Sequence, residues 1–351
     1  MKKTNLFVAA LLGSALTLSS CSSEENVVKE DSNLAQMGVE VGISGNVDSR
    51  SGITAKSFGN GETLGLYVYT KDMTDAAATD YQYNYVNAKT NEELNPTVNV
   101  PYNWNGALWF ASQPIILSNI QGFVYAYYPY SELNVGNDGR SIPITVSPNQ
   151  ETGQSDGSKD ANGQTDYMWA TPKSGISNLK PKVNLSMNHA LAKVSFTFKH
   201  AEKAEKYPGA GLITDITLKS VKTGKATLNI TNGTISEPET ANGSILLTGM
   251  NQGGNGTLIE ETSAALVPSL LLYPQTLSGS QVTVKIDGVD YTVDIPASMT
   301  KFEAGKHYTM QFTVKGTALV VNEVSINEWK DGGSDKGEDV SNPDSQDTDP
   351  A

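Results

Sequence analysis

Histidines, a lone cysteine and clustered carboxylates are the residues with which this chain could do chemistry, and they are sparse. The histidines His189, His200 and His307 lie far apart in sequence, and none has a second ligand at a metal-binding spacing. His189 and His307 adjoin apolar runs, so a structural hydrogen bond is the favoured role for both. The sequence contains no nucleophile elbow and no phosphate-binding loop. It therefore predicts no catalytic residues, no metal and no cofactor.

The acidic segment "SDGSKDANGQTD" comes nearest to a calcium site. Read as an EF-hand loop from Ser158, it places Asp160, Asn162 and Gly163 in register. The first position is then Ser, and the twelfth is Trp169, where a bidentate Glu is needed. A plain turn-forming loop is the favoured interpretation.

The aromatic run "VYAYYPY" admits two interpretations. In a strand, Tyr125 and Tyr127 point to one face and Tyr128 and Tyr130 to the other. The run could therefore stack on a glycan, or it could be a core strand that enters a Tyr-Pro turn. The core strand is favoured.

Cys21 is the only cysteine, and its position points to lipid attachment. A basic "MKK" and a short apolar run precede it, which is typical of a secretory signal and too short for a membrane span. The run ends in "LSSC", which resembles a bacterial lipobox, and "CSSEEN" resembles the surface-export signal of Bacteroidetes lipoproteins. We predict a signal peptide over residues 1–20, a lipidated Cys21, a polar tether over 21–36 and an outward-facing place on the outer membrane.

The composition is acidic, with 38 Asp and Glu against 25 Lys and Arg and a net charge of −13. A basic stripe for phosphate contacts is missing from the sequence, so nucleic acid is excluded as a partner. Residues 330–351 hold many Asp and almost no apolar side chain, which predicts a disordered acidic tail.

The remaining chain is a series of short strand-like runs between Gly, Asn, Asp, Ser and Pro clusters. "VTVKIDGVDYTV" predicts a hairpin with a tight turn at Asp287 and Gly288. No long segment has a 3.6-residue period, so the predicted class is all-β, as sandwiches or partly open barrels. Length and a composition shift in "HAEKAEKYPGAG" predict two domains, over residues 37–205 and 206–329.

Arginine is rare: Arg50 and Arg140 are the only two. Arg50 follows the first strand-like run, in which Val39, Val41 and Ile43 alternate at period two. Ser and Gly surround Arg50, so the sequence places it in a loose, accessible loop.

The order of several motifs is distinctive. They are "GETLGLYVY", "YNWNGALWF", "VYAYYPY", "TDYMWA", "LSMNHALAKVSFTF", "LVPSLLLYPQ", "FEAGKHYTMQFTV" and "VSINEW". Together with the lipobox-like Cys21, this order resembles the fimbrillin family of Bacteroidetes, the Mfa-like pilus subunits and related surface lipoproteins, over about residues 37–329.

The resemblance implies two β-sandwich domains of transthyretin-like topology and a lipidated precursor. It also implies an arginine-specific protease at the cell surface that cuts after the first strand, so that a strand from a neighbouring subunit fills the groove. Here the cut would fall between Arg50 and Ser51. The removable strand, in residues 37–50, would present Val39, Val41, Ile43 and Val47.

The residues leave two alternatives for the donor strand. "TALVVNEVSINEW" near the C-terminus alternates suitably, with Val320, Val324 and Ile326 on one face. Either this segment swings out as the donor, or the subunit has no exchangeable donor, which suits a tip, anchor or accessory subunit. If Arg50 is never cut, the protein stays a lipid-tethered monomer.

Three classes of function compete. The leading hypothesis is a fimbrial subunit whose partners are other subunits, the protease and, through the lipid, the outer membrane. The second is a surface lipoprotein that binds a glycan or host ligand through exposed aromatic residues. The third, a glycan hydrolase, needs converging carboxylates that spacing alone cannot locate.

Overall fold

The computed structural model describes residues 34–44, 58–73, 98–132, 140–151, 163–202, 204–250, 257–259, 268–295, 301–316 and 318–329. The chain splits into two units, and all of the described ranges belong to the second, Asn33–Ala351. The described secondary structure is β-strand, without an α-helix in these ranges, which confirms the all-β prediction. No described helix could therefore cross a membrane.

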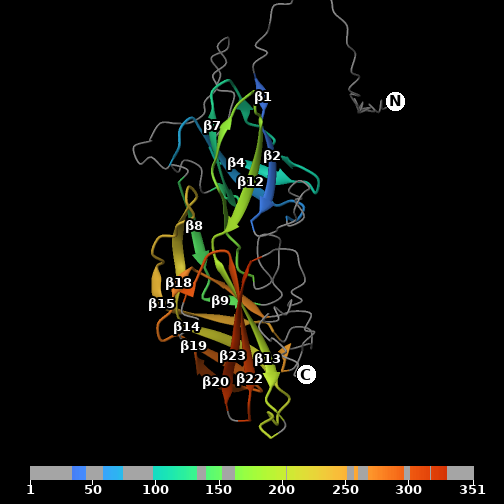
Figure 1. Cartoon of the computed structure of the whole chain (residues 1–351), viewed down its shortest axis with the longest axis vertical. Helices are drawn as coiled ribbons and strands as arrows, with labels where there is room; N and C mark the ends of the chain where they lie inside the picture. Colours follow the sequence, from blue (N-terminus) through green and yellow to red (C-terminus); the bar gives the residue numbers. More distant parts are fainter. Residues whose placement is uncertain are drawn as a thin grey trace, which may run out of the picture. The chain divides into compact units, whose positions relative to one another are not determined.

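The first large sheet has eight strands, ordered β2-β12-β10-β7-β3-β4-β5, with β11 paired to β7. Figure 1 labels β2, β4, β7 and β12 of this sheet. Strands β2 and β5, at the two ends of this order, contact each other. The strands are β2 (Gly38–Ile43), β3 (Thr63–Tyr69), β4 (Val100–Trp104), β5 (Trp109–Phe110), β7 (Gly122–Tyr128), β10 (Met168–Ala170), β11 (Lys173–Ile176) and β12 (Lys182–His189).

Strands β3 and β7 lie inside this sheet and bury both faces. Val124 and Tyr128 join one hydrophobic cluster, called the first cluster below, whereas Tyr125 and Tyr127 join another, the second cluster. The Tyr125 hydroxyl donates to Asp72 at 2.9 Å, and burial raises its pKa. The predicted core strand is confirmed, and the buried rings of Tyr125, Tyr127 and Tyr128 form no exposed platform for a glycan.

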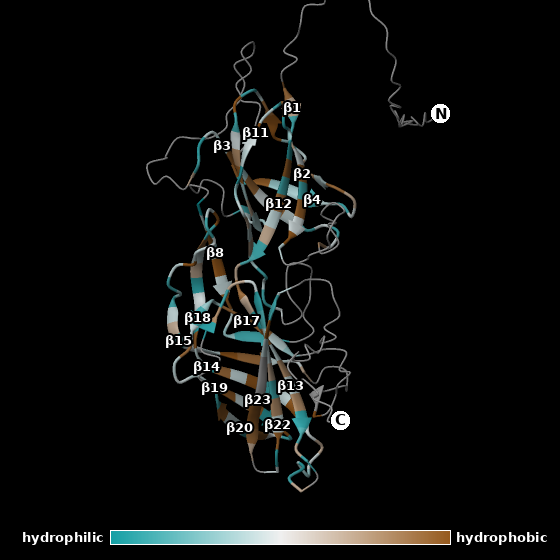
Figure 2. Ribbon diagram, in the orientation of Figure 1, coloured by the Kyte–Doolittle hydropathy of each residue, from teal (hydrophilic) through white to brown (hydrophobic). Residues whose placement is uncertain are grey.

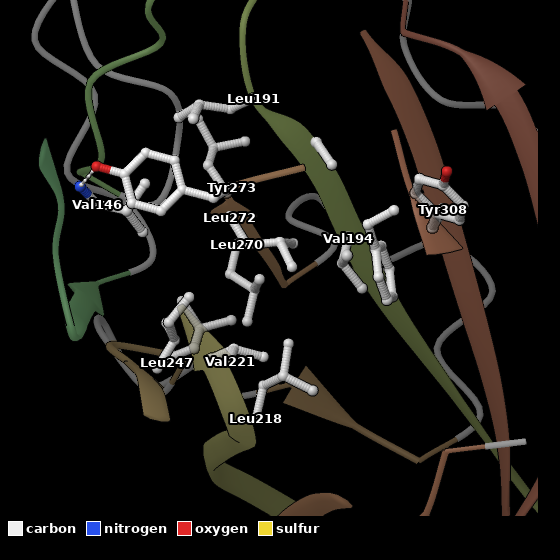
Figure 3. Close-up of a cluster of buried hydrophobic side chains, with 14 of the residues drawn as sticks. Val146, Leu191, Val194, Leu218, Val221, Leu247, Leu270, Leu272, Tyr273 and Tyr308 are labelled. Carbon is white, nitrogen blue, oxygen red and sulfur yellow. Dashed lines mark hydrogen bonds between the residues drawn. The ribbon is translucent and has the colours of Figure 1, made fainter. Parts of the chain in front are cut away.

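Two further large sheets share the second cluster of buried residues (Figure 3). One is four-stranded, ordered β17-β13-β22-β23, and the other is seven-stranded, ordered β20-β19-β14-β15-β9, with β8 and β16 paired to β14. Figure 2 shows hydrophobic residues along β14 and β19. Their bounds are β8 (Ser141–Val146), β9 (Asn149–Glu151), β13 (Ala192–His200), β14 (Leu212–Asn229), β15 (Thr240–Thr248), β16 (Thr257–Leu258), β17 (Ser269–Leu272), β19 (Gln281–Ile286), β20 (Val289–Asp294), β22 (Lys306–Val314) and β23 (Leu319–Glu328).

Two small pairs complete the described strands. β1 (Ala35–Gln36) pairs with β6 (Ile116–Leu117), and β18 (Gln275–Thr276) pairs with β21 (Lys301–Phe302).

The hairpin of β19 and β20 has the predicted turn. Asp287 and Gly288 have φ values of 48° and 81°, which is the left-handed pair that a type I′ turn requires. The Asp287 carboxylate also accepts hydrogen bonds from the backbone N–H groups of Gly211 and Leu212, both at 2.9 Å. The hydrogen bond from Gly211 is the largest cause that lowers the pKa of Asp287.

Strand pairing changes between β12, which ends at His189, and β13, which begins at Ala192. β8 and β9 precede β10 in sequence but pair with β14 and β15. The predicted domain division at residues 205 and 206, and the transthyretin-like topology, stay predictions.

Candidate functional site: two edge strands

β2 lies at one end of the eight-stranded order, where β12 is its neighbour in the described sheet. The two strands run parallel, with Val41 opposite Leu185 and Ile43 opposite Met187. Figure 1 shows β2, in blue, beside the yellow-green β12. A short edge strand with one ladder is the kind of element that can be exchanged without dismantling a sheet.

The alternation expected of β2 is present. Val39, Val41 and Ile43 are 8%, 1% and 7% exposed, while Glu40 between them is exposed. Gly42 is also buried, so the second half of the strand is enclosed on both sides. The strand thus inserts an apolar row into the first cluster. Its removal by proteolysis stays a prediction.

Hydrogen bonds fix both ends of β2. At the start, Gly38 donates to the Pro181 carbonyl at 2.9 Å. At the end, the Ser44 N–H donates to the Met187 carbonyl at 2.7 Å, and the Ser44 and Ser186 hydroxyls lie 2.7 Å apart. These bonds hold the strand in one register against β12.

The segment before β2 also packs on the first cluster, where Met37 is buried. The Met37 N–H donates to the Ile115 carbonyl at 2.8 Å, and β1, directly before Met37, pairs with β6, directly after Ile115. Ile115 in turn donates to the Tyr102 hydroxyl at 3.5 Å. Burial raises the pKa of Tyr102 to about 12, so the phenol stays neutral at physiological pH.

The energy of this insertion is large on the scale of a domain. Burying one Val or Ile side chain contributes about 1.5–3 kcal/mol, so the three of β2 together contribute several kcal/mol. A whole domain is stable by only about 5–15 kcal/mol. A groove left empty by loss of β2 would therefore be costly, and a replacement strand would be strongly favoured.

β23 is the second edge strand, at the end of the four-stranded order. It pairs antiparallel with β22, with a register shift at Gln311 and Phe312. Val320 and Ile326 are 37% and 55% exposed, so two of the three candidate donor residues face outward. The backbone of Val324 is in the strand, opposite Met310.

Buried residues hold both ends of β23. Leu319 is buried at its start, and Trp329 is buried directly after its end. The Trp329 ring stacks on His189 with centroids 3.9 Å apart and planes 6° apart. The backbone N–H of Trp329 donates to the Gly305 carbonyl at 2.9 Å. Release of β23 as a donor would have to break these contacts.

His189 has the structural role that its position predicted. Its Nδ1 lies 3.0 and 2.9 Å from the two carboxylate oxygens of Asp166. Lys193 places its Nζ 5.6 Å from the Trp329 ring centre. The partners of His189 could not be predicted from the sequence, because Asp166 and Trp329 are distant from it along the chain. His307 is likewise hydrogen-bonded, with Nε2 2.7 Å from the Ser195 hydroxyl.

Several predicted positions lie outside the described residues. They are Cys21, Val47, Arg50, Ser51, the tail over 330–351 and most of the acidic loop that could suit calcium. Among the residues that are described, no group of three or more His, Cys, Asp or Glu side chains could hold a metal ion.

Residues 50–329, most of the chain, match the family described as fimbrillin-like. The chain belongs to the fimbrillin-like family. The resemblance found in the motif order is thereby confirmed, and this fimbrillin-like protein is a structural protein rather than an enzyme. No curated protein sequence matches it.

Solved structures show the same fold. A putative cell adhesion protein from Bacteroides ovatus is 18% identical, with a TM-score of 0.60, over 85% of this chain and 98% of that one. Another from Bacteroides uniformis is 19% identical, with a TM-score of 0.57, over 84% and 99%. The fimbrillin-like protein and these two share a fold at low sequence identity.

Proposed function

We propose that this fimbrillin-like protein is a cell-surface fimbrial subunit that assembles by strand exchange. In this proposal it is exported as a precursor lipidated at Cys21, which tethers it to the outer membrane. An arginine-specific protease then cuts between Arg50 and Ser51 and frees β2. A strand from a neighbouring subunit fills the vacated groove.

The main support for this proposal is the position and burial of β2. It is a six-residue edge strand with one ladder, and its apolar row completes the first cluster. The match to the family begins at residue 50, so β2 lies before the matched region. Both facts support a segment that completes the precursor and is separate from the mature subunit.

The chemistry of the groove explains why assembly would form a filament. Loss of β2 leaves unpaired backbone groups on β12 and an apolar row without cover, which together bind an alternating strand. Donor and acceptor are different surfaces of one subunit. Such a heterologous contact propagates head to tail instead of closing as a dimer.

The candidate donor is β23, whose Val320 and Ile326 already face outward. The buried Leu319 and Trp329 favour a second candidate role. A subunit that keeps β23 in place could accept a strand without donating this one, as a tip, anchor or accessory subunit would.

The test is the N-terminus of the protein on its native cell surface, measured by intact mass and sequencing. Sizing before and after treatment with an arginine-specific protease accompanies it. A start at Ser51 together with higher oligomers supports strand exchange. A lipidated Cys21 start on a protease-resistant monomer would overturn the cleavage step.

A further inference from the structure

The two arginines of this chain lie in nearly the same local sequence. Residues 48–51 read Asp-Ser-Arg-Ser, and residues 138–141 read Asp-Gly-Arg-Ser. A protease that recognises arginine and its immediate neighbours meets the same aspartate, a small residue, arginine and serine at both places. The side chains next to the bond therefore do not favour Arg50 over Arg140.

In the folded protein, the Arg140–Ser141 bond lies at the start of a paired strand. The Arg140 carbonyl, which belongs to the scissile bond, accepts a hydrogen bond from the Ile230 N–H at 2.8 Å. Ser141 is the first residue of β8 and lies opposite Asn229 of β14. The Nε atom of Arg140 is buried. The bond and the arginine side chain are thus both engaged by the folded protein.

Hydrogen bonds hold β8 along one edge and at the end of its other edge. One edge pairs with β14 from Ser141 to Val146. On the other, the Gln164 side chain donates to the Thr145 carbonyl at 2.9 Å and accepts from the Ser147 N–H at 2.8 Å. The Val146 N–H donates to the Tyr273 hydroxyl at 3.2 Å, as Figure 3 shows.

Alternate side chains of β8 are buried in the core. Ile142, Ile144 and Val146 alternate along the strand, and all three are buried in the second cluster. Endoproteases bind a substrate as an extended strand that pairs with the enzyme, and accessible loops are their usual targets. Cleavage after Arg140 therefore requires β8 to leave β14 and the core first.

We propose that the β8–β14 ladder shields the Arg140–Ser141 bond, so that folding selects which Asp-x-Arg-Ser sequence an arginine-specific protease cuts. This inference rests on the proposed cleavage at Arg50. In a chain whose β8 is detached, hydrolysis adds one water across the bond and leaves a carboxylate on Arg140 and an amine on Ser141. That cut separates β1 to β7 from the remaining strands, so a misfolded subunit is destroyed and not activated.

The experiment treats the full-length precursor with a purified arginine-specific endopeptidase, in native buffer and in denaturing urea. Intact mass reports the cut at each arginine over time. In urea both bonds should be cut at similar rates. In native buffer the cut after Arg140 should be slower than in urea by at least about 100-fold at equal peptidase activity, because it tracks the population of opened β8. Native cleavage at Arg140 within a few-fold of the urea rate would overturn the proposal.

The two proposals fail in different ways. If native protein resists at both arginines and denatured protein is cut at both, shielding of Arg140 stands and cleavage at Arg50 fails. If native protein is cut at both, shielding fails. Arg50→Lys and Arg140→Lys assign each fragment to its bond.

A matched pair of variants tests the role of the ladder. Ile144→Asp places a charge in the core under β8, whereas Thr145→Asp places it on the exposed face of the same strand. Ile144→Asp should raise native cleavage at Arg140 by at least about tenfold, and Thr145→Asp should leave it unchanged. Equal native rates for the two variants, with folding checked by circular dichroism, would contradict the shielding role.

Discussion

Val41 is the most buried of the three apolar residues Val39, Val41 and Ile43 in β2, and it lies opposite Leu185. Val41→Ala should lower the free energy of unfolding of the uncut protein by about 2 kcal/mol, because it leaves a cavity between β2 and β12. The matched control Glu40→Ala, at the exposed neighbouring position, should change it by less than about 0.5 kcal/mol. Urea unfolding followed by tryptophan fluorescence measures both. Equal effects would show that β2 does not support the fold.

Trp329 is the residue that fixes the end of β23. Trp329→Ala should cost about 3–5 kcal/mol of unfolding free energy, because a large buried ring and its stack on His189 are lost. Trp329→Phe keeps an aromatic face on His189 and should cost much less. Calorimetry of the two variants checks this. A small loss for Trp329→Ala would mean that β23 is held mainly by its ladder to β22.

Asp287 should make folding pH-dependent in the acid range. Its folded pKa is lowered, first by the hydrogen bond from Gly211, so the folded state binds the proton less readily than the unfolded state. The stabilisation is present above the unfolded pKa and is lost as the pH falls through the folded pKa. Asp287→Asn keeps a residue that tolerates positive φ and removes the charge. Its stability should therefore fall less between about pH 5 and about pH 2 than that of the native sequence. Parallel acid-unfolding curves for the two proteins would contradict this assignment.

Single residues could be read from the sequence where their signal is local. The Asp287-Gly288 pair predicted a tight turn, because few residue pairs accept two positive φ angles. The contact between His189 and Asp166 could not be predicted, because periodicity indicates that a side chain faces inward but not which residue it contacts there.

At the scale of elements, the exchange of β2 can be blocked with a disulfide. Glu40 and Asn184 are exposed and lie opposite each other in the parallel pair, where strand spacing brings Cα atoms to a separation of about 5 Å that a disulfide can span. In a Cys21→Ser background, Glu40→Cys with Asn184→Cys should keep the N-terminal segment bound after the protease cut. The oxidised protein should stay monomeric, and reduction should start assembly.

Sizing of the cut protein with and without reductant measures this effect. The single variant Glu40→Cys is the control, and it should assemble in both conditions. Rapid assembly of the oxidised double variant would show that β2 need not leave.

The elements themselves were largely predictable, but their partners were not. The alternation of Val39, Val41 and Ile43 identified β2 and its inner face. Nothing in that alternation says that β12, about 140 residues later, is its neighbour, or that the pair is parallel. The run at Tyr125 to Tyr128 buries both faces because β7 lies between two clusters. The same tyrosine sequence could equally lie on an exposed sheet, so the sequence alone did not distinguish the two arrangements.

At the scale of the whole molecule, acidic residues outnumber basic ones, with a net charge of −13 for the full chain. The part after Arg50 is also negative, which should oppose assembly. Raising the salt concentration from about 10 to about 150 mM shortens the screening length from about 30 to about 8 Å. Polymerisation of the cut protein should therefore be faster in the higher salt. Light scattering measures the rate, and Arg50→Lys protein should show no growth at either concentration. A rate that falls with salt would mean that opposite charges guide the contact.

The all-β class followed from the spacing of turn residues and the lack of a helical period. The assignment of strands to sheets did not follow in the same way. β8 and β9 pair with strands about 80 to 100 residues later, because a buried apolar row such as that of Ile142 and Ile144 fits any complementary sheet. Long-range pairing is a property of the packed chain and leaves little trace in a local pattern.

The direction of β2 gives the precursor a thermodynamic bias. Parallel ladders are slightly weaker per residue than antiparallel ones. An incoming strand that runs antiparallel on β12 would keep the same inward-facing alternation and form the stronger ladder. The uncut chain would then be metastable, and each subunit that joins would lower the total free energy. Growth driven in this way needs no nucleotide, and its reversal would be slow.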